Sequence, residues 1–228
     1  MKDKAIPKHI AFIMDGNRRW AKQKRLAKIV GHRIGFDKVR TAVKHCANLG
    51  IKAVSIYAFS TENWDRSKEE IDAIFAIVRD NMHSAKEEFI RDGIRVVTSG
   101  DLSRFPQDMQ DVLIDVVEAT QGNTRCTLNL CVNYGGRADI VRAANLAIAE
   151  NKPVTESDFA RHLYAAELPD LDFVVRTSGE QRISNFMLWH LSYAELYFPK
   201  LHWPAITPKF INKCVKEFQR RNRRFGKN

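Results

Sequence analysis

The 228-residue sequence predicts one α/β domain, in which helices flank a mostly parallel six-stranded sheet. Short apolar segments alternate along the chain with longer segments whose apolar residues recur every three or four positions. Strands that are separated by helices pair in parallel, and the helices then cover the sheet. No repeat, low-complexity tract or Gly-, Ser- or Pro-rich linker interrupts residues 1–228, so a single domain is expected.

The predicted strands are six short apolar segments. The first of them, IAFIM at residues 10–14, has five consecutive apolar residues, which is typical of a strand that is buried on both faces. The predicted strands are residues 10–14, 53–59, 94–98, 127–132, 172–175 and 194–198.

Helices are predicted from apolar spacing and from residues that begin or end a helix. A short helix is expected to open after the first strand. Residues 21–35 are basic and bounded by glycine, so the next helix is predicted only over 36–49, ending at Gly50. Ser67 and Glu70 predict a capping box that opens a helix reaching about residue 91, and this role already explains Glu70. The other predicted helices begin at Pro106, after residue 132, near Thr155 and at Thr207.

The net charge of +10 is concentrated at the two ends of the chain. Residues 1–40 contain twelve Lys or Arg and three acidic residues, and residues 207–228 contain eight and one. This pattern suits an anionic partner, which is a nucleic acid, an anionic membrane surface or a phosphorylated small molecule. The four cysteines form no CxxC pair and the start has no signal-peptide pattern, so a cytoplasmic protein with reduced thiols is expected. No apolar run is long enough to span a membrane.

Polar residues follow the first, second, fourth and fifth predicted strands where each strand ends. Because the carboxyl ends of parallel strands meet at one edge of a sheet, where ligands bind, these segments predict one site. Arginine binds phosphate through two donors, and carboxylates with phosphate oxygens suit Mg²⁺. The candidate ligands are Asp15, Arg18, Arg19, Lys28, His32, Glu62, Arg66, Arg176, Arg182 and Glu195.

These residues favour a Mg²⁺-dependent enzyme that acts on a phosphate or diphosphate. The sequence has neither GxxxxGK[ST] nor GxGxxG, so the common nucleotide-binding loops are absent. No Ser-His-Asp or Cys-His arrangement is visible either. The residues alone leave the substrate open, and the segment 15–20 by itself also fits an ordinary turn with a solvated basic face.

Four motifs resemble the signature regions of the cis-prenyltransferase family, in order from about Ile10 to Gly226. They are MDGNRRWA, GHRIG, YAFSTENWDR and RTSGEQRISNFMLWHLSYAELYF. The resemblance implies a non-Rossmann fold with a hydrophobic tunnel beside the sheet. It also implies condensation of isopentenyl diphosphate units onto an allylic diphosphate, here farnesyl diphosphate. The expected product is undecaprenyl diphosphate, a lipid carrier precursor for cell-wall synthesis, with a shorter product as the alternative.

The resemblance also assigns roles by position. Asp15 and Asn63 are the expected catalytic residues, and Asp15 with Glu195 are the expected Mg²⁺ ligands, Glu195 reaching across a homodimer. The expected substrate-binding residues are Gly16, Asn17, Arg18, Arg19, Trp20, Lys28, His32, Ser60, Thr61, Glu62, Trp64, Arg66, Arg176, Arg182, Ile183 and Ser184. The sequence departs from the family at Lys28, where arginine is usual and lysine gives a point charge without a fork, and at Ser67 and Gln181.

Three further expectations follow from the family resemblance and from side-chain chemistry. An amide is a poor base, so Asn63 is expected to orient or relay, with Asp15 or a diphosphate oxygen as final proton acceptor. The helix from Ser67 to about Arg91 is the expected tunnel wall, and its expected lining residues are Ile71, Ile74, Phe75, Val78 and Met82. Peripheral contact with the inner face of the plasma membrane is expected for product release. The basic ending RRNRRFG fits a solvated helix end or a membrane-surface patch, and its Arg224-Phe225-Gly226 also resembles a family ending that approaches a partner's active site.

Two alternatives from other classes are weaker. In a nucleic-acid-binding protein, aromatic residues would interleave with the basic ends as stacking platforms; here they do not, and no nucleic-acid recognition motif appears. A catalytically silent accessory subunit would not need Asp15, Asn63, Arg176, Arg182 and Glu195.

Overall fold

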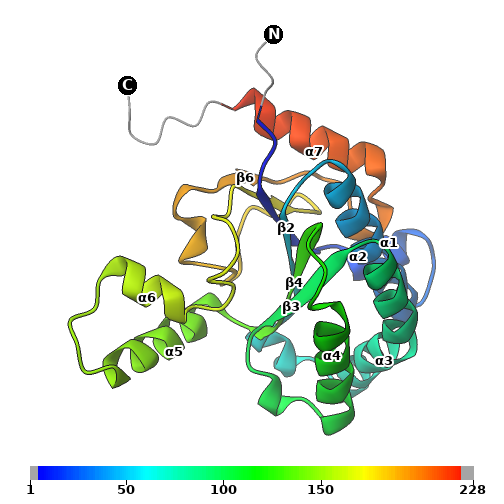
Figure 1. Ribbon diagram of the computed structural model, residues 1–228. Coiled ribbons are helices and arrows are strands. Elements are labelled where there is room, and N and C mark those ends of the chain that lie inside the picture. Colours follow the sequence, from blue (N-terminus) through cyan, green and yellow to red (C-terminus); the bar gives the residue numbers. More distant parts are fainter. Residues whose placement is uncertain (1–4, 222–228) are drawn as a thin grey trace.

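The computed structural model describes residues 5–221, and within them a single six-stranded sheet has the order β3-β4-β2-β1-β5-β6 (Figure 1). Every neighbouring pair is parallel. The strands are β1 (His9–Ile13), β2 (Ala53–Ser60), β3 (Ile94–Ser99), β4 (Cys126–Tyr134), β5 (Phe173–Arg176) and β6 (Glu195–Tyr197). All six predicted strands are confirmed to within a few residues. The basic C-terminal ending lies outside the described residues.

Seven α-helices lie in the described part of the chain, and they confirm the predicted alternation with strands. They are α1 (Asn17–Gln23), α2 (Lys28–Asn48), α3 (Lys68–Arg91), α4 (Gln107–Thr120), α5 (Gly136–Ala149), α6 (Glu156–His162) and α7 (Pro208–Arg220). The chain thus forms an α/β fold with helices around a parallel sheet.

The second helix, α2, is longer than predicted because its glycines were wrongly taken as a boundary. Gly31 and Gly35 lie one turn apart inside α2 and face the start of α1. A Cβ on Gly31 would lie 2.2 Å from the Asn17 carbonyl oxygen, and a Cβ on Gly35 would lie 2.5 Å from Asn17 Oδ1. The two glycines therefore serve close packing of α1 on α2, and they do not end the helix.

The two faces of the sheet are covered differently. Alternate strand residues such as Ile10 and Phe12 pack under α2, α3, α4 and α7 in the larger apolar core. The other face carries Ala11 and Ile13, and it packs against residues of the 163–191 segment such as Phe186. In Figure 1, α5 and α6 extend to one side of the sheet. On the face of the larger core, α2, α3 and α4 therefore lie next to the sheet.

A buried polar chain crosses four neighbouring strands. His9 Nδ1 lies 2.8 Å from the Pro169 carbonyl oxygen and His9 Nε2 lies 2.8 Å from Ser55 Oγ. Asn129 donates to Ser55 Oγ at 3.0 Å and accepts from Ser99 Oγ at 2.8 Å. Burial lowers the pKa of His9 from 6.5 to about 4. The neutral ring therefore fits this network, with Nδ1 donating to Pro169.

We expect His9 to make the fold sensitive to acid. Between pH 6.5 and pH 4 the unfolded state binds more protons at His9 than the folded state does. As the pH is lowered from 6.5 to 4, the free energy of unfolding should therefore fall by on the order of 3 kcal/mol because of His9 alone. Urea unfolding at a series of pH values should show that acidification lowers the free energy of unfolding less in His9→Gln than in the wild type. Substitution of the exposed His83, as His83→Gln, serves as a control. If acidification lowered the free energy of unfolding of His9→Gln as much as that of the wild type, His9 would not be the source of the acid sensitivity.

Candidate functional site

The carboxyl ends of β1, β2 and β5 bring the central candidate residues together. Because β1 lies between β2 and β5 in the sheet, the segments that follow these three strands are neighbours. Asp15 follows β1, Asn63 lies in the short 3-10 helix Thr61–Asp65 after β2, and Arg176 is the last residue of β5. All three side chains line one cavity, so the predicted convergence is confirmed for these three strand ends. Residues 133–137, the polar residues expected at the end of the fourth strand, do not line it.

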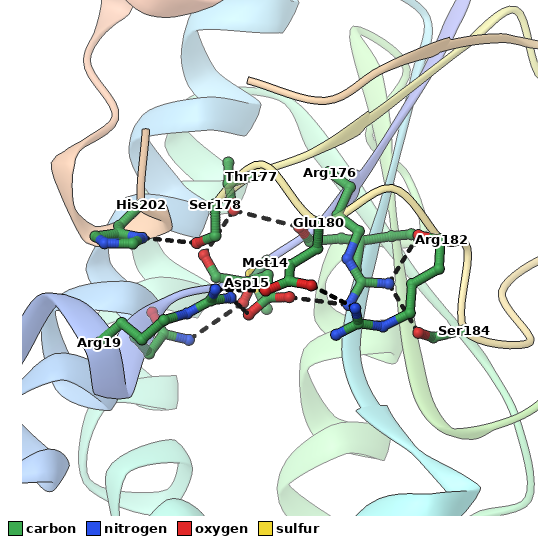
Figure 2. Close-up of polar contacts among 12 residues, drawn as sticks. Met14, Asp15, Arg19, Arg176, Thr177, Ser178, Glu180, Arg182, Ser184 and His202 are labelled. Atoms are coloured by element: carbon green, nitrogen blue, oxygen red, sulfur yellow. Dashed lines mark hydrogen bonds and ion pairs between the residues drawn. The ribbon is translucent and has the colours of Figure 1, made fainter. Parts of the chain in front are cut away.

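Asp15 stands between two arginines (Figure 2). Arg176 Nη2 donates to Asp15 Oδ2 at 2.9 Å, and Arg19 Nη2 donates to Asp15 Oδ1 at 2.8 Å. Burial acts to raise the pKa of the Asp15 carboxyl, but the hydrogen bonds from Arg176 and Arg19 outweigh it and hold that pKa below its usual value. Asp15 is therefore an anion at neutral pH, and it is fixed in position by both of its oxygens.

Arg176 is buried and connects Asp15 with the loop after β5. Its Nη1 donates at 2.7 Å to the Arg182 carbonyl oxygen and at 2.7 Å to Ser184 Oγ. The planar guanidinium therefore fixes the strand end and the following loop as one unit. Its buried Nε has no hydrogen-bond partner within residues 5–221.

The loop from Asp15 to Gly16 is held by residues that the sequence did not single out. The Asp15 carbonyl oxygen accepts from Thr177 Oγ1 at 2.7 Å and from the Trp203 amide at 3.0 Å. Gly16 has φ 99°, and a Cβ there would lie 2.0 Å from Ser178 Oγ. Only glycine fits this position.

Ser178 is in turn bonded to His202, at 2.8 Å between Oγ and Nδ1 (Figure 2). Thr177 and Ser178 lie inside the motif RTSGEQR, which could have indicated them. His202 has no comparable signal, because it lies between apolar residues far along the chain.

A second group of charges surrounds Glu70. Its carboxylate lies 3.1 Å from Arg66 Nη1, 3.6 Å from His32 Nε2 and 3.7 Å from Arg18 Nη1. Ser67 is confirmed as the N-cap of α3, because its Oγ accepts from the Glu70 amide. The other half of the predicted capping box is wrong, because the Glu70 side chain turns to these three basic groups. Burial, together with the charge of Arg66, lowers the pKa of His32. Glu70 therefore belongs to the site.

Asn63 is positioned by a capping box of its own. Its Oδ1 accepts from the Ser60 amide at 3.2 Å, and Ser60 caps the same 3-10 helix. Nearby, Glu62 accepts from Asn185 Nδ2 at 3.1 Å, and this contact helps to keep the pKa of Glu62 below its usual value although burial opposes it. The Asn63 side chain is therefore fixed through its amide oxygen.

Several predicted site residues do not line the cavity. Trp64 donates to Asn133 Oδ1 at 2.8 Å and packs in an aromatic cluster, with Phe59 at 5.1 Å between ring centroids. Lys28, the first residue of α2, is exposed. Neither Lys28 nor Trp64 lines the cavity, and the same holds for Gly16, Arg18, Arg19, Trp20, Thr61, Glu62 and Ile183. Some of these, such as Arg19, still contact residues that do line it.

Glu195 is also separate from Asp15 within one chain. It begins β6 and aligns with Phe173 at the start of β5, whereas Arg176 stands at the far end of β5. Its carboxylate is 2.9 Å from Arg221 Nη1. In one chain, therefore, Glu195 lies at the opposite end of the sheet from Asp15.

A cavity of about 420 Å³ opens at the polar group and continues between α2, α3, α4 and the sheet. Its polar end has Asp15, Asn17, His32 and Asn63, and its apolar part includes Val39, Val78, Met82, Phe89, Leu113 and Leu128. Of the residues expected on this wall of α3, Ile74, Val78 and Met82 line the cavity. Ile71 and Phe75 instead face the core, which corrects the predicted wall at these two positions. Charged and polar side chains thus line one part of a cavity whose remainder is apolar.

Comparison with known proteins identifies the family. The family model described as "Putative undecaprenyl diphosphate synthase" matches residues 13–226. The chain belongs to this family of prenyltransferases. The family that the motifs predicted is therefore confirmed.

Relatives resemble this prenyltransferase over nearly their whole length. An isoprenyl transferase of Clostridium perfringens is 42% identical, over 97% of this chain and 90% of the relative. The ditrans,polycis-undecaprenyl-diphosphate synthase of Haemophilus influenzae, specific for (2E,6E)-farnesyl diphosphate, is 41% identical over 97% and 95%.

Solved structures agree with this fold. Lavandulyl diphosphate synthase from Lavandula x intermedia, in complex with dimethylallyl diphosphate, has a TM-score of 0.93 at 33% identity, covering 99% of this chain and 100% of that chain. A probable undecaprenyl diphosphate synthase from Campylobacter jejuni has a TM-score of 0.84 at 34% identity, covering 98% and 100%.

Proposed function

We propose that this prenyltransferase condenses isopentenyl diphosphate units onto farnesyl diphosphate and makes undecaprenyl diphosphate, the precursor of a lipid carrier for cell-wall synthesis. One observation carries the proposal: two groups of basic side chains stand at the mouth of one apolar cavity. The reaction brings together two diphosphate groups, each of which needs basic side chains, and one hydrocarbon tail, which needs an apolar cavity. The farnesyl starter and undecaprenyl product agree with the name of the relative from Haemophilus influenzae.

The two basic groups suit the two substrates. The allylic diphosphate would lie at the loop of Asp15, Gly16 and Asn17, near Arg18 and His32. Isopentenyl diphosphate would lie against Arg176, Arg182 and Ser184. As the allylic C–O bond breaks, charge develops on the departing diphosphate, and fixed cationic donors stabilise it there. Holding the second double bond near the allylic carbon lowers the entropic cost of the reaction.

Mg²⁺ fits the donors at this site. Asp15 is a half-buried, ionised carboxylate next to the proposed diphosphate position, and Mg²⁺ is commonly bound by one or two carboxylates together with substrate phosphates. Asp15 would hold the ion, and Glu195 of a second copy is the proposed further ligand. When bound, Mg²⁺ neutralises negative charge on the diphosphate.

Asn63 is proposed to orient the substrate while a proton is lost. Its side chain is fixed by the Ser60 amide and faces the cavity with Asp15. An amide takes up no proton at neutral pH, so the proton would go to a diphosphate oxygen or to Asp15.

The apolar cavity is proposed to receive the growing tail as the hydrophobic tunnel of the family. Each buried CH₂ contributes about 0.8 kcal/mol, so each five-carbon unit gains up to roughly 4 kcal/mol on entering. A cavity of about 420 Å³ is in the range that binds compact ligands, which suits a starter tail. An eleven-unit tail would require α3 and its neighbours to move apart.

We also propose that the protein is a homodimer that contacts the membrane peripherally, at the inner face of the plasma membrane. Val141, Leu146 and Ile148 on α5 are exposed apolar side chains that a second copy would cover. The edge strand β6, which begins with Glu195, is unpaired on its outer side in the described chain. No helix within residues 5–221 is long and apolar enough to cross a membrane.

Replacing Arg182 should mainly weaken binding of isopentenyl diphosphate. Its side chain is 58% exposed, so Arg182→Ala should leave the fold intact. We expect KM for isopentenyl diphosphate to rise about tenfold with a smaller change in kcat, since a charged hydrogen-bond donor is lost. Steady-state kinetics with Arg95→Ala, an arginine of an exposed pair on β3, gives the control. An unchanged KM in Arg182→Ala would remove this residue from the substrate site.

The proposed activity is tested by incorporation of labelled isopentenyl diphosphate into extractable lipid, with farnesyl diphosphate and Mg²⁺. We expect incorporation that EDTA abolishes, and a chromatogram with an eleven-unit product. A shorter product would correct the chain length alone. Folded protein that incorporates no label but binds RNA or DNA with steep salt dependence would overturn the proposal.

A further inference from the structure

Five charged side chains at the site form a chain of alternating sign, and the proposed chemistry leaves one of them without a role. The order is Arg176, Asp15, Arg19, Glu180 and Arg182 (Figure 2). Glu180 Oε1 accepts from Arg19 Nη1 at 2.5 Å, and Glu180 Oε2 accepts from Arg182 Nη1. Glu180 therefore occupies donors of two arginines that are proposed to bind diphosphates.

The main chain holds Glu180 in this place. Ser178 and Gly179 have positive φ angles of 76° and 73°, so the chain turns sharply just before Glu180. The Ser178 and Gly179 amides donate to the carbonyl oxygens of Leu201 and Pro199, both at 2.8 Å, which fixes the turn. This fixed turn of the main chain thus places Glu180 next to the two arginines.

We propose that Glu180 is an internal competitor for diphosphate, whose carboxylate holds Arg19 and Arg182 until a diphosphate displaces it. Carboxylate and phosphate oxygens bind the same guanidinium donors, so both cannot hold them fully at once. The side chains of Arg19, Glu180 and Arg182 are 43%, 27% and 58% exposed, so a diphosphate from solution reaches them. The hydrogen bonds from Arg182 and Arg19 lower the pKa of Glu180, which keeps this competitor ionised at neutral pH.

The proposal rests on the proposed function for the position of the diphosphates, and it addresses their release. Each condensation leaves one inorganic diphosphate among several cations. If these cations had no other partner, the product would leave slowly. As the diphosphate departs, the Glu180 carboxylate returns to Arg19 and Arg182 and restores two ion pairs. These ion pairs replace part of the attraction between the arginines and the diphosphate, so the product leaves more easily.

The test is calorimetric titration of the full chain with inorganic diphosphate, in buffer of fixed ionic strength without divalent metal. In Glu180→Gln the competing charge is gone while the side-chain shape is kept. We expect the Kd for diphosphate to fall by about 3- to 10-fold, the effect of losing two exposed ion pairs. Glu180→Ala should give the same direction. Glu167→Gln breaks a comparable exposed pair with Arg95 outside the site and should leave the Kd unchanged.

A double variant shows whether the effect passes through the arginine. In the Arg182→Ala background, Glu180→Gln should tighten diphosphate binding less than it does in the wild type. Equal or weaker binding by both Glu180 variants, with unchanged melting temperatures, would overturn the proposal. The readout needs no turnover, so wild type that binds diphosphate but makes no polyprenyl product would disprove the proposed function and leave the competitor result standing.

Discussion

Replacing Asp15 by alanine should lower kcat by at least about a thousandfold while the protein stays folded. Asp15 is the ionised carboxylate between Arg19 and Arg176, and it is the proposed Mg²⁺ ligand next to the departing diphosphate. Its loop is held through its carbonyl oxygen by Thr177 and Trp203, and these bonds survive loss of the side chain. Incorporation of labelled isopentenyl diphosphate, with circular dichroism on the same samples, measures both effects.

An isosteric variant separates the charge of Asp15 from its shape. Asp15→Asn keeps one acceptor oxygen for an arginine but has no charge, so its activity should fall almost as far as that of Asp15→Ala. Turnover within tenfold of wild type in either variant, with the fold intact, would remove Asp15 from the chemistry.

Replacing Arg176 should have the second largest effect, because this buried group serves three partners at once. We expect Arg176→Ala to lower kcat/KM for isopentenyl diphosphate at least about a hundredfold. It should also lower the free energy of unfolding by on the order of 3 kcal/mol, since Asp15 loses a nearly buried partner. Kinetics and urea unfolding of the same variant report the two changes.

Arg176→Lys is the matched control for charge. Lysine keeps the positive charge, but a single ammonium cannot bond Asp15 and Ser184 in the geometry of the guanidinium fork. Activity should therefore remain at least tenfold below wild type. Full activity in Arg176→Lys would show that charge alone is needed at this position.

Much of the site was predictable because strand ends converge for a general reason. Asp15, Asn63 and Arg176 follow buried apolar segments, and in a parallel sheet such ends share one edge. Their order in the sheet was not visible, but any parallel arrangement brings strand ends to that edge. The periodicity of α3 likewise indicated an apolar wall, although only part of it faces the cavity.

The residues that sequence reasoning missed depend on contacts between distant segments. Glu70 has a local explanation as a cap, and only the approach of Arg18, His32 and Arg66 shows where its carboxylate turns. Gly31 and Gly35 resemble helix breaks until α1 is seen packed against them. His202 lies at the site because the chain after β6 returns past Asp15. Such placements follow from tertiary packing, and no short-range pattern encodes them.

The central claim is that segments far apart in the chain hold two diphosphates beside one apolar cavity. A crystal structure with Mg²⁺, isopentenyl diphosphate and an unreactive thio analogue of farnesyl diphosphate tests it most directly. We expect one diphosphate at Arg176, Arg182 and Ser184, the other at the loop from Asp15 to Arg18, and the farnesyl tail between α3 and the sheet. A complex with the tail outside this cavity, or with either diphosphate bound away from Asp15 and Arg176, would contradict the account.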